Sequence, residues 1–229
     1  MDLMELKEAV LEANLSTVRD GLVMATFGNA SGIDRGTGRI AIKPSGVPYA
    51  TMKPDDMVAV NLDGSLIDNR FKPSSDLDTH LVLYRAFEGI GSVVHTHSTY
   101  ATIFAQARTA IPAFGTTHAD YFRGPIPVTR DLTAEEIAER YVAATGQAIV
   151  DTIGGRDPLE IPAILVANHG PFVWGRTPQE AALNALILEE VAKMAFCTLQ
   201  LAPSVKEMPQ ALMDRHFLRK HGSAATYGQ

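Results

Sequence analysis

The chain has 229 residues, of which 46% are hydrophobic and 20% charged, and this balance suits one globular domain with a substantial core. Its formal net charge of −6 argues against nucleic acid as a partner, because nucleic-acid-binding surfaces carry an excess of Lys and Arg. The single cysteine excludes an intramolecular disulfide, and the acidic N-terminus is unlike a signal peptide. No apolar run is long enough for a membrane span. We therefore expect a cytoplasmic protein.

The first third of the chain predicts one helix and then strands separated by loops of small and polar residues. Apolar residues at helical spacing predict a helix over 3–19. Predicted strands cover 22–27, 39–43 and 57–62, with a hairpin return over 65–67 and polar loops at 28–32, 43–46 and 72–76. Ser75, three residues before Asp78, predicts the start of a second helix that ends near Gly89.

The rest of the chain predicts further strands and four helices. Predicted strands cover 92–98, 126–128, 161–167 and 172–174, the last two as a hairpin. A capping box of Thr133 and Glu136 predicts a helix to about Thr145, with Gly146 as its stop. A cap at Thr177 predicts a long helix to residue 201, and shorter helices are expected over 100–107 and 209–220. Residues 113–122 are interpreted as a functional loop. Without repeats or linkers, the pattern predicts a single α/β domain over 1–229.

Two histidines at the end of a predicted strand are the strongest chemical signal in the sequence. Val93 and Val94 begin the strand, and the alternation continues through His95 and His97. Side chains two residues apart on a strand point to the same face, so both imidazoles would project together. A hydrophobic interior gains nothing from such a pair, and the pattern therefore favours half of a metal site over two rings that each satisfy a backbone group.

His169 and Asp76 are the further candidate metal ligands. His169 follows a buried strand, in a segment that could lie beside the strand of His95 and His97. Asp76 follows two serines in a polar loop. Three histidines, with or without a carboxylate, are a usual zinc ligand set, whereas two histidines and one carboxylate can also hold iron in oxygenases.

Three loops of small and polar residues suggest an anion site. The candidate residues are Gly28 and Asn29 in the first loop, Lys43, Ser45 and Gly46 in the second, and Ser74 and Ser75 in the third. Clustered backbone N–H groups and hydroxyls bind phosphate without a large net charge. Each loop alone is explained by turn chemistry, but their recurrence at strand ends, twice with a lysine, favours a phosphate-binding role.

Proton transfer would need a further titratable group, and Asp120 is the candidate. It lies in a loop with Thr116, Thr117, His118 and Tyr121, where a carboxylate could exchange a proton in a dry site. The alternative is a solvated loop carboxylate. His216 and His221, near the last helix, are interpreted as surface or interface residues, and His216 is the better candidate of the two for a functional role.

Taken together, the motifs resemble the L-ribulose-5-phosphate 4-epimerase family of the class II aldolase/adducin superfamily. The blocks that carry the resemblance are Gly28-Asn-Ala-Ser31, Lys43-Pro-Ser-Gly46, Pro73-Ser-Ser-Asp76, His95-Thr-His97, Gly115-Thr-Thr-His-Ala-Asp120, Asn168-His-Gly-Pro-Phe172 and Tyr227-Gly-Gln229. They occur in the family's order and cover essentially the whole chain.

The resemblance implies a three-layer α/β/α fold around a mostly antiparallel sheet, assembled as a homotetramer with active sites between subunits. It implies one Zn²⁺ per subunit on His95, His97 and His169, with Asp76 in or beside the shell and with Mn²⁺ or another divalent ion as the alternative. It implies a phosphorylated ketopentose substrate and a place in carbohydrate metabolism; the supplying pathway, arabinose catabolism or another route, stays open.

The resemblance also assigns the remaining residues. The seven loop residues named above would hold the substrate, mainly its phosphate, and His216 would line the same site. Asp120 and Tyr227, from the neighbouring subunit, would be the two proton carriers. For Tyr227, a tail residue in a glycine-rich context, only the resemblance points to this role.

The implied reaction interconverts L-ribulose 5-phosphate and D-xylulose 5-phosphate by cleaving and re-forming the bond between carbons three and four. Two proton carriers on opposite faces are needed because the epimers present their hydroxyls oppositely. The alternatives are an aldolase of the L-fuculose-1-phosphate type, in which a glutamate stands at the position of Asp76, and a non-catalytic adducin-like interaction domain, which lacks the metal histidines.

Overall fold

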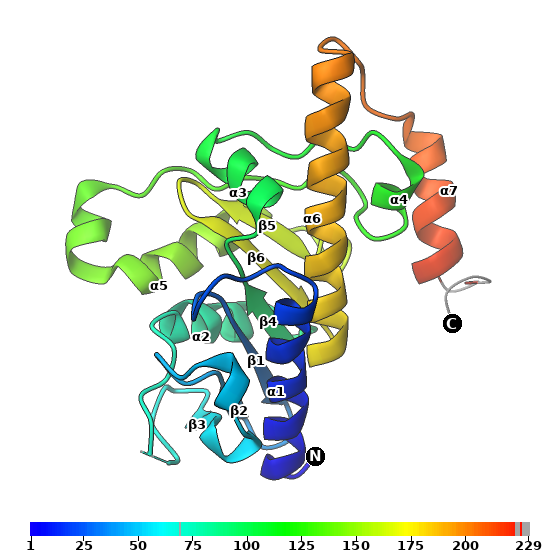
Figure 1. Ribbon diagram of the computed structural model, residues 1–229. Helices are drawn as coiled ribbons and strands as arrows, with labels where there is room; N and C mark the ends of the chain where they lie inside the picture. The colour runs from blue at the N-terminus through cyan, green and yellow to red at the C-terminus, as the bar shows by residue number, and fades with distance from the viewer. Residues whose placement is uncertain (69, 223–224, 226–229) are drawn as a thin grey trace.

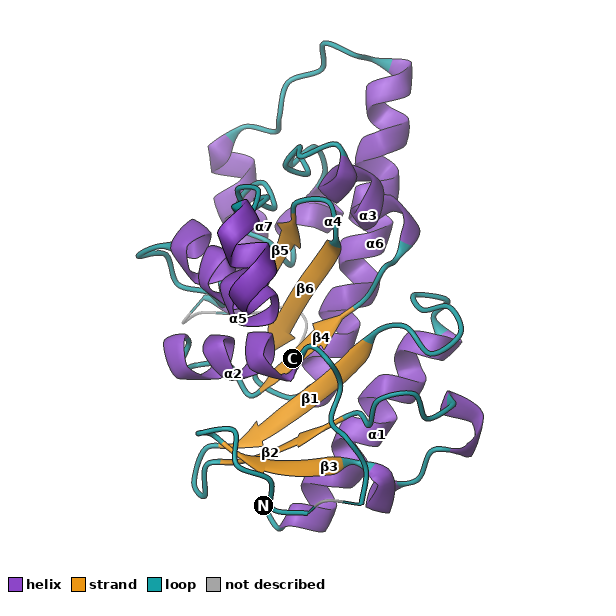
Figure 2. Cartoon of the chain, turned by 90° about the vertical axis from the view of Figure 1, so that its left-hand side faces the viewer, coloured by secondary structure: helices purple, strands orange, loops and turns teal. Residues whose placement is uncertain are grey.

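The computed structural model describes residues 1–68, 70–222 and 225, which form a six-stranded antiparallel sheet with helices on both faces (Figures 1 and 2). The strand order is β3-β2-β1-β4-β6-β5. The strands are β1 (Asn29–Asp34), β2 (Arg39–Ile42), β3 (Val58–Asn61), β4 (Ser92–His95), β5 (Ala163–Val166) and β6 (Gly170–Gly175). The helices are α1 (Leu3–Arg19), α2 (Leu77–Ala86), α3 (Thr99–Gln106), α4 (Thr116–Ala119), α5 (Ala134–Ile153), α6 (Pro178–Leu201) and α7 (Gln210–His221), with 3₁₀ helices η1 (Tyr49–Thr51) and η2 (Pro54–Asp56).

Alternation along the central strands divides the core between the two faces of the sheet. Val93, Phe172 and Trp174 belong to a cluster with residues of α2 and α5. Their neighbours Val94 and Val173 belong to a second cluster, with residues of α3 and α6. Successive side chains of a strand point to opposite faces, so the period of two builds both layers at once. The predicted three-layer α/β/α architecture is confirmed.

The predicted helix starts are confirmed where a side chain caps the first turn. The Thr133 side chain accepts a hydrogen bond from the Glu136 backbone N–H, and the Glu136 carboxylate accepts from the Thr133 N–H at 2.9 Å. Thr177 caps α6 in the same way, with Pro178 as the first helical residue. These caps satisfy donors that a helix N-terminus otherwise leaves unpaired. In the described part of the chain, no helix combines the length and the apolar character that a membrane span requires.

The prediction for residues 22–32 is wrong, because strand and loop are exchanged. Residues 22–27 form a loop with a turn at 25–26, and most of the predicted loop 28–32 contributes to β1 instead. Ala25 and Gly28 have φ of 51° and 76°, which interrupts an extended backbone. Met24 and Phe27 are 68% and 57% exposed, so their apolar side chains do not face a core. The small residues of β1 instead pair with both β2 and β4.

The helix predicted to stop at Gly146 continues to Ile153, with a kink at Arg140. A Cβ at Gly146 would lie 2.8 Å from Cβ of Val82 and 3.2 Å from the carbonyl oxygen of Thr79. Glycine is therefore required here by the close packing of α5 on α2 rather than by a helix end.

Several other elements are shorter or differently capped than predicted. The strand predicted over 92–98 ends at His95, and the segments at 65–67 and 126–128 contribute only isolated bridges. The loop 113–122 contains α4. Helix α2 has Asp76 rather than Ser75 at its N-cap position, without a side-chain cap, because the Asp76 carboxylate bonds to Asn29 instead.

We expect Gly146→Ala to destabilise the protein by about 1–3 kcal/mol through overpacking against Val82. In an exposed helix the same change would stabilise by about 1 kcal/mol, so the sign of the effect reports the helix contact. Urea unfolding measures it. Gly155→Ala is the control, since a Cβ there meets no atom within 4 Å; a stabilised Gly146 variant would contradict the expectation.

Candidate metal centre and substrate pocket

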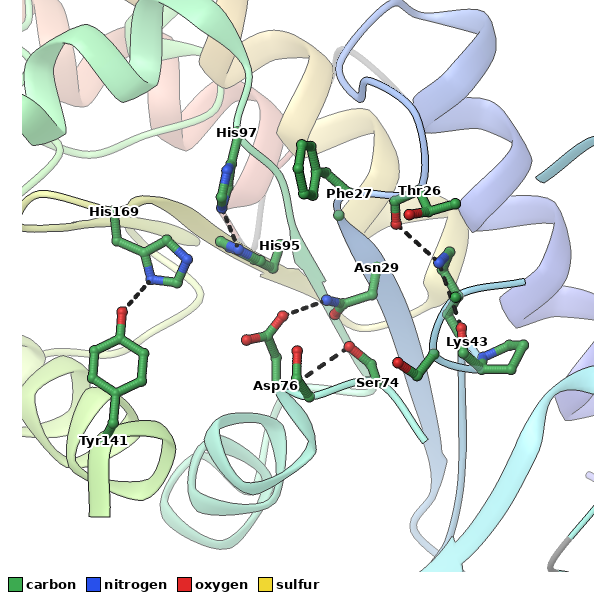
Figure 3. Close-up of a pocket in the computed structure, with 15 residues that line it drawn as sticks. Thr26, Phe27, Asn29, Lys43, Ser74, Asp76, His95, His97, Tyr141 and His169 are labelled. Carbon is green, nitrogen blue, oxygen red and sulfur yellow. Dashed lines mark hydrogen bonds between the residues drawn. The ribbon is translucent and has the colours of Figure 1, made fainter. Parts of the chain in front are cut away.

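The sheet brings three histidines together from two separate segments (Figure 3). His95 is the last residue of β4, and His97 follows two residues later. His169 lies in the turn between β5 and β6, where Asn168 adopts a φ of 63°. Because β4 and β6 are neighbours, with His95 opposite Phe172, this turn lies beside the end of β4.

The close approach of the two segments depends on Gly170. A Cβ at this position would lie 2.7 Å from the carbonyl oxygen of Thr96 and 3.2 Å from Cδ2 of His97. Any side chain would push the turn of His169 away from the segment that carries His97. Gly170 therefore sets the distance between the ligand candidates from the two segments.

The geometry of the histidine triad (His95, His97 and His169) suits a divalent cation. Nε2 of His95 lies 3.1 Å from Nε2 of His97, and one ring nitrogen from each of the three residues lies within 4.8 Å of the others. A zinc ion about 2.0–2.1 Å from tetrahedrally arranged nitrogens holds them about 3.3 Å apart. The triad can therefore hold a metal.

Hydrogen bonding prepares His95 as a ligand through Nε2. Its Nδ1 lies 2.9 Å from the carbonyl oxygen of Pro171, which can only accept, so Nδ1 carries the proton. The ring also stacks on Phe172, with centroids 4.2 Å apart and an angle of 18° between planes. A ring held in this way leaves the Nε2 lone pair directed at the triad.

Burial keeps the triad uncharged. It lowers the pKa of His95 well below the usual value, and the neighbouring His169 and His97 rings lower it further. Burial likewise lowers the pKa of His97 and of His169, although the Asp76 charge opposes the shift in both. Neutral imidazoles are the form that binds metal, so the site is ready for a cation at neutral pH.

Asp76 lies beside the triad rather than within its 4.8 Å group. Its Oδ2 accepts a hydrogen bond from Nδ2 of Asn29 at 2.7 Å. The Oδ1 of Asn29 is buried and has no hydrogen-bond partner among the described residues. The pair thus offers a negative charge and a free acceptor at the edge of the candidate metal site.

A pocket of about 420 Å³ opens in front of the triad. It is lined by all seven predicted loop residues, Gly28, Asn29, Lys43, Ser45, Gly46, Ser74 and Ser75, together with Asp76 and the three histidines. Sequence reasoning missed four further lining residues, Thr26, Phe27, Pro44 and Tyr141. Candidate anion loops and candidate metal ligands therefore share one cavity.

Lys43 supplies a positive charge to this pocket. Its side chain is buried, with Nζ 3.2 Å from the carbonyl oxygen of Thr26 and 4.8 Å from the centroid of the Tyr49 ring. Burial lowers the pKa of Lys43. In the described part of the chain its ammonium pairs with no carboxylate, so an anionic ligand would be its strongest partner.

Asp120 and His216 form a different cluster, outside the lining of this pocket. Asp120 Oδ1 lies 3.0 Å from Nδ1 of His216, and both carboxylate oxygens lie 3.2 Å from Nη2 of Arg219. The cluster joins the C-terminal end of α4 to α7, away from the triad (Figure 1). Tyr227, the other predicted proton carrier, lies outside the described residues.

A buried histidine network supports the site from helix α2. Nδ1 of His80 lies 2.7 Å from Oγ of Ser31, which lies 2.7 Å from the Tyr84 hydroxyl. Burial lowers the pKa of His80 to about 3. The sequence offered no signal for this neutral histidine, because its position on the inner face of α2 depends on how the helix packs.

Comparison with known proteins agrees with the fold. A family model described as the class II aldolase and adducin N-terminal domain matches residues 8–196. An L-fuculose 1-phosphate aldolase structure is 25% identical, with a TM-score of 0.79 over 93% of this chain and 94% of that chain. YgbL of Escherichia coli, for which aldolase, epimerase and decarboxylase are named as candidate activities, is 25% identical, with a TM-score of 0.75 over 93% and 98%. YgbL of Klebsiella pneumoniae is 24% identical, with a TM-score of 0.75 over 94% and 99%.

We expect Gly170→Ala to weaken Co²⁺ binding about tenfold or more, because the added methyl group separates the turn of His169 from His97. Titration of the metal-free protein, followed by Co²⁺ absorption, measures the affinity. Gly36→Ala, in the turn between β1 and β2, serves as the control. Equal affinity in the Gly170 variant and the wild type would show that the close approach is not needed.

We expect the metal-free protein to lose stability as the pH falls from about 6.5 towards 3, in part through His80. Unfolded chains protonate this ring near pH 6.5, whereas the folded protein excludes the proton down to about pH 3. Unfolding therefore becomes easier by up to about 1.4 kcal/mol per pH unit from this one group. Urea unfolding at a series of pH values, with chelator present, should give a shallower slope for His80→Gln; parallel slopes would refute the assignment.

Proposed function

The chain belongs to the class II aldolase and adducin N-terminal domain family, and from this premise we propose that it is a metal-dependent L-ribulose-5-phosphate 4-epimerase. The observation that carries the proposal is the shared cavity, where three neutral histidines face loops suited to phosphate. The motif blocks that resemble the epimerases, Asp76 and Asp120 among them, favour epimerisation over release of cleaved fragments.

The pocket loops would hold the sugar phosphate. Lys43 contributes a buried positive charge, and Ser45, Ser74 and Ser75 contribute hydroxyl groups. A phosphate placed there would orient the sugar chain towards the triad, because both features line one cavity. Orientation of this kind lets the enzyme act on carbons three and four without contacts to every hydroxyl.

The triad would hold Zn²⁺, with Asp76 in or beside the ligand set. When bound, the ion supplies a Lewis acid for the ketone and the adjacent hydroxyl of the substrate. Burial keeps His95 and His169 neutral, so their nitrogen lone pairs are available to the metal and are not occupied by protons. Asn29 holds the Asp76 carboxylate at the edge of the site and keeps it from swinging freely.

Asp120 and Tyr227 would exchange the proton of the hydroxyl on carbon four. One residue removes this proton as the bond between carbons three and four breaks, the aldehyde turns its other face, and the second residue returns a proton as the bond re-forms. Asp120 does not line the pocket of its own chain. The proposal therefore places these two residues in the site of a neighbouring copy, within a homotetramer.

The second candidate function is a sugar-phosphate aldolase, favoured by the structural similarity to L-fuculose 1-phosphate aldolase. Such an enzyme would use the same triad and pocket but release the two fragments. A non-catalytic adducin-like domain is disfavoured, because such domains lack the metal histidines that converge in this structure.

Incubation with L-ribulose 5-phosphate tests the proposal. We expect D-xylulose 5-phosphate to accumulate, no reaction after chelation, and recovery on addition of Zn²⁺ or Mn²⁺. Accumulation of dihydroxyacetone and glycolaldehyde phosphate would instead support the aldolase. Metal-loaded protein that forms neither product would reject the epimerase.

Two kinds of variant should separate metal binding from proton transfer. His97→Asn should lose both metal and activity, whereas Asp120→Asn and Tyr227→Phe should keep the metal and lose about 10²-fold or more in turnover. Asp63→Asn, in an exposed turn, serves as the carboxylate control. Metal loss in the Asp120 variant would assign that residue a structural role.

A further inference from the structure

Tyr141 reaches the triad from helix α5, and no sequence motif pointed to it (Figure 3). We propose that Tyr141 is a positioning residue of the metal centre: its hydroxyl oxygen accepts a hydrogen bond from Nδ1–H of His169 and so directs Nε2 of that ring at the cation. The inference rests on the metal site of the proposed function and adds to it a residue outside the ligand set.

The contact lies at the rim of the pocket. The Tyr141 hydroxyl is 3.4 Å from Nδ1 of His169, and the two ring centroids are 6.3 Å apart with planes inclined by 31°. Nδ1 and Nε2 are the two distinct nitrogens of an imidazole ring, so a partner that fixes the proton on Nδ1 leaves the lone pair of Nε2 for the metal. The 3.4 Å separation is at the long end for a hydrogen bond.

His95 shows the same arrangement, in which an oxygen acceptor at Nδ1 leaves Nε2 free to face the other histidines. There the carbonyl oxygen of Pro171 accepts from Nδ1 at 2.9 Å, and Nε2 faces His97. His169 lies in a turn, and Tyr141 supplies from another element the acceptor that β6 supplies to His95. Metal-binding histidines commonly need such a partner to fix the tautomer and the ring orientation.

The backbone of α5 is shaped to present Tyr141. Arg140, the residue before it, has φ of −151° and ψ of 37°, which breaks the helix direction. The following turns continue as helix, where Thr145 Oγ1 donates to the Tyr141 carbonyl at 2.9 Å and Gly146 packs closely on α2. Helix α2 begins beside Asp76, so the packing of α5 on α2 at Gly146 also sets the position of Tyr141 relative to Asp76.

The hydroxyl stays neutral and adds no charge to the centre. Burial raises the pKa of Tyr141, and the Asp76 charge raises it further. Removal of the hydroxyl should therefore change the orientation of the His169 ring and leave the net charge of the site unaltered.

Tyr141→Phe tests the inference with Co²⁺ and Zn²⁺ as probes. We expect about tenfold weaker Zn²⁺ binding, measured by competition with a chromophoric chelator, and an altered Co²⁺ absorption spectrum. The urea midpoint of the metal-free protein should stay at the wild-type value, which separates positioning from a general structural role. The matched control is Tyr100→Phe, on a ring that packs against Phe196, and it should bind both ions as the wild type does.

The outcomes distinguish this inference from the proposed function. Equal affinity and an equal spectrum in Tyr141→Phe and wild type would overturn the inference and leave the function standing. A wild-type protein that binds no divalent ion would overturn both. A wild-type protein that binds the ion but forms no epimer would reject the function alone.

NMR of the unmodified Zn²⁺-loaded protein tests the same point without a variant. Long-range ¹H–¹⁵N correlations of the imidazole rings should show His169 protonated at Nδ1, with Nε2 bound to the metal. Metal on Nδ1 would overturn the inference directly.

Discussion

The candidate site depends on one close approach, where the turn after β5 meets the end of β4. The register that places His95 opposite Phe172 brings the two segments side by side, and Gly170 lets them come within contact distance. Neither strand alone carries a complete ligand set. The antiparallel sheet therefore assembles the ligand set, because it brings together residues more than seventy positions apart in the sequence.

The surroundings of the triad follow from the requirement that its rings remain neutral. Burial lowers the pKa of the three histidines, and burial also leaves His80 uncharged in its network with Ser31. Among the described residues that line the pocket, Lys43 and Asp76 carry the side-chain charges. In such a cavity an anionic group can bind beside Lys43 while a cation binds at the histidine triad beside Asp76. A metal-assisted reaction of a sugar phosphate needs both kinds of binding.

Under the proposed function, each polypeptide contributes two different halves of the chemistry. The pocket gathers the metal ligands and the phosphate loops, whereas Asp120, His216 and Arg219 gather on α4 and α7. The segregation explains why the pocket of one chain contains candidate ligands but not the candidate proton carrier. Tyr141 belongs to the first half, since it reaches the triad of its own chain through the kinked α5.

Alternation and capping boxes in the sequence predicted a single α/β domain and most helix starts, because these signals act over a few neighbouring residues. The three-layer arrangement was predicted from the resemblance to a known family, and the polar loops predicted most, but not all, of the residues that line the pocket. The sequence predicted His95, His97 and His169 as ligands, but the convergence of their nitrogens was decided by the sheet. It misread Gly146 as a helix end and residues 22–27 as a strand, since packing on α2 and positive φ angles overrode local preference. It missed Tyr141 and His80 altogether, because a helical residue becomes part of a site only through the direction in which its helix packs.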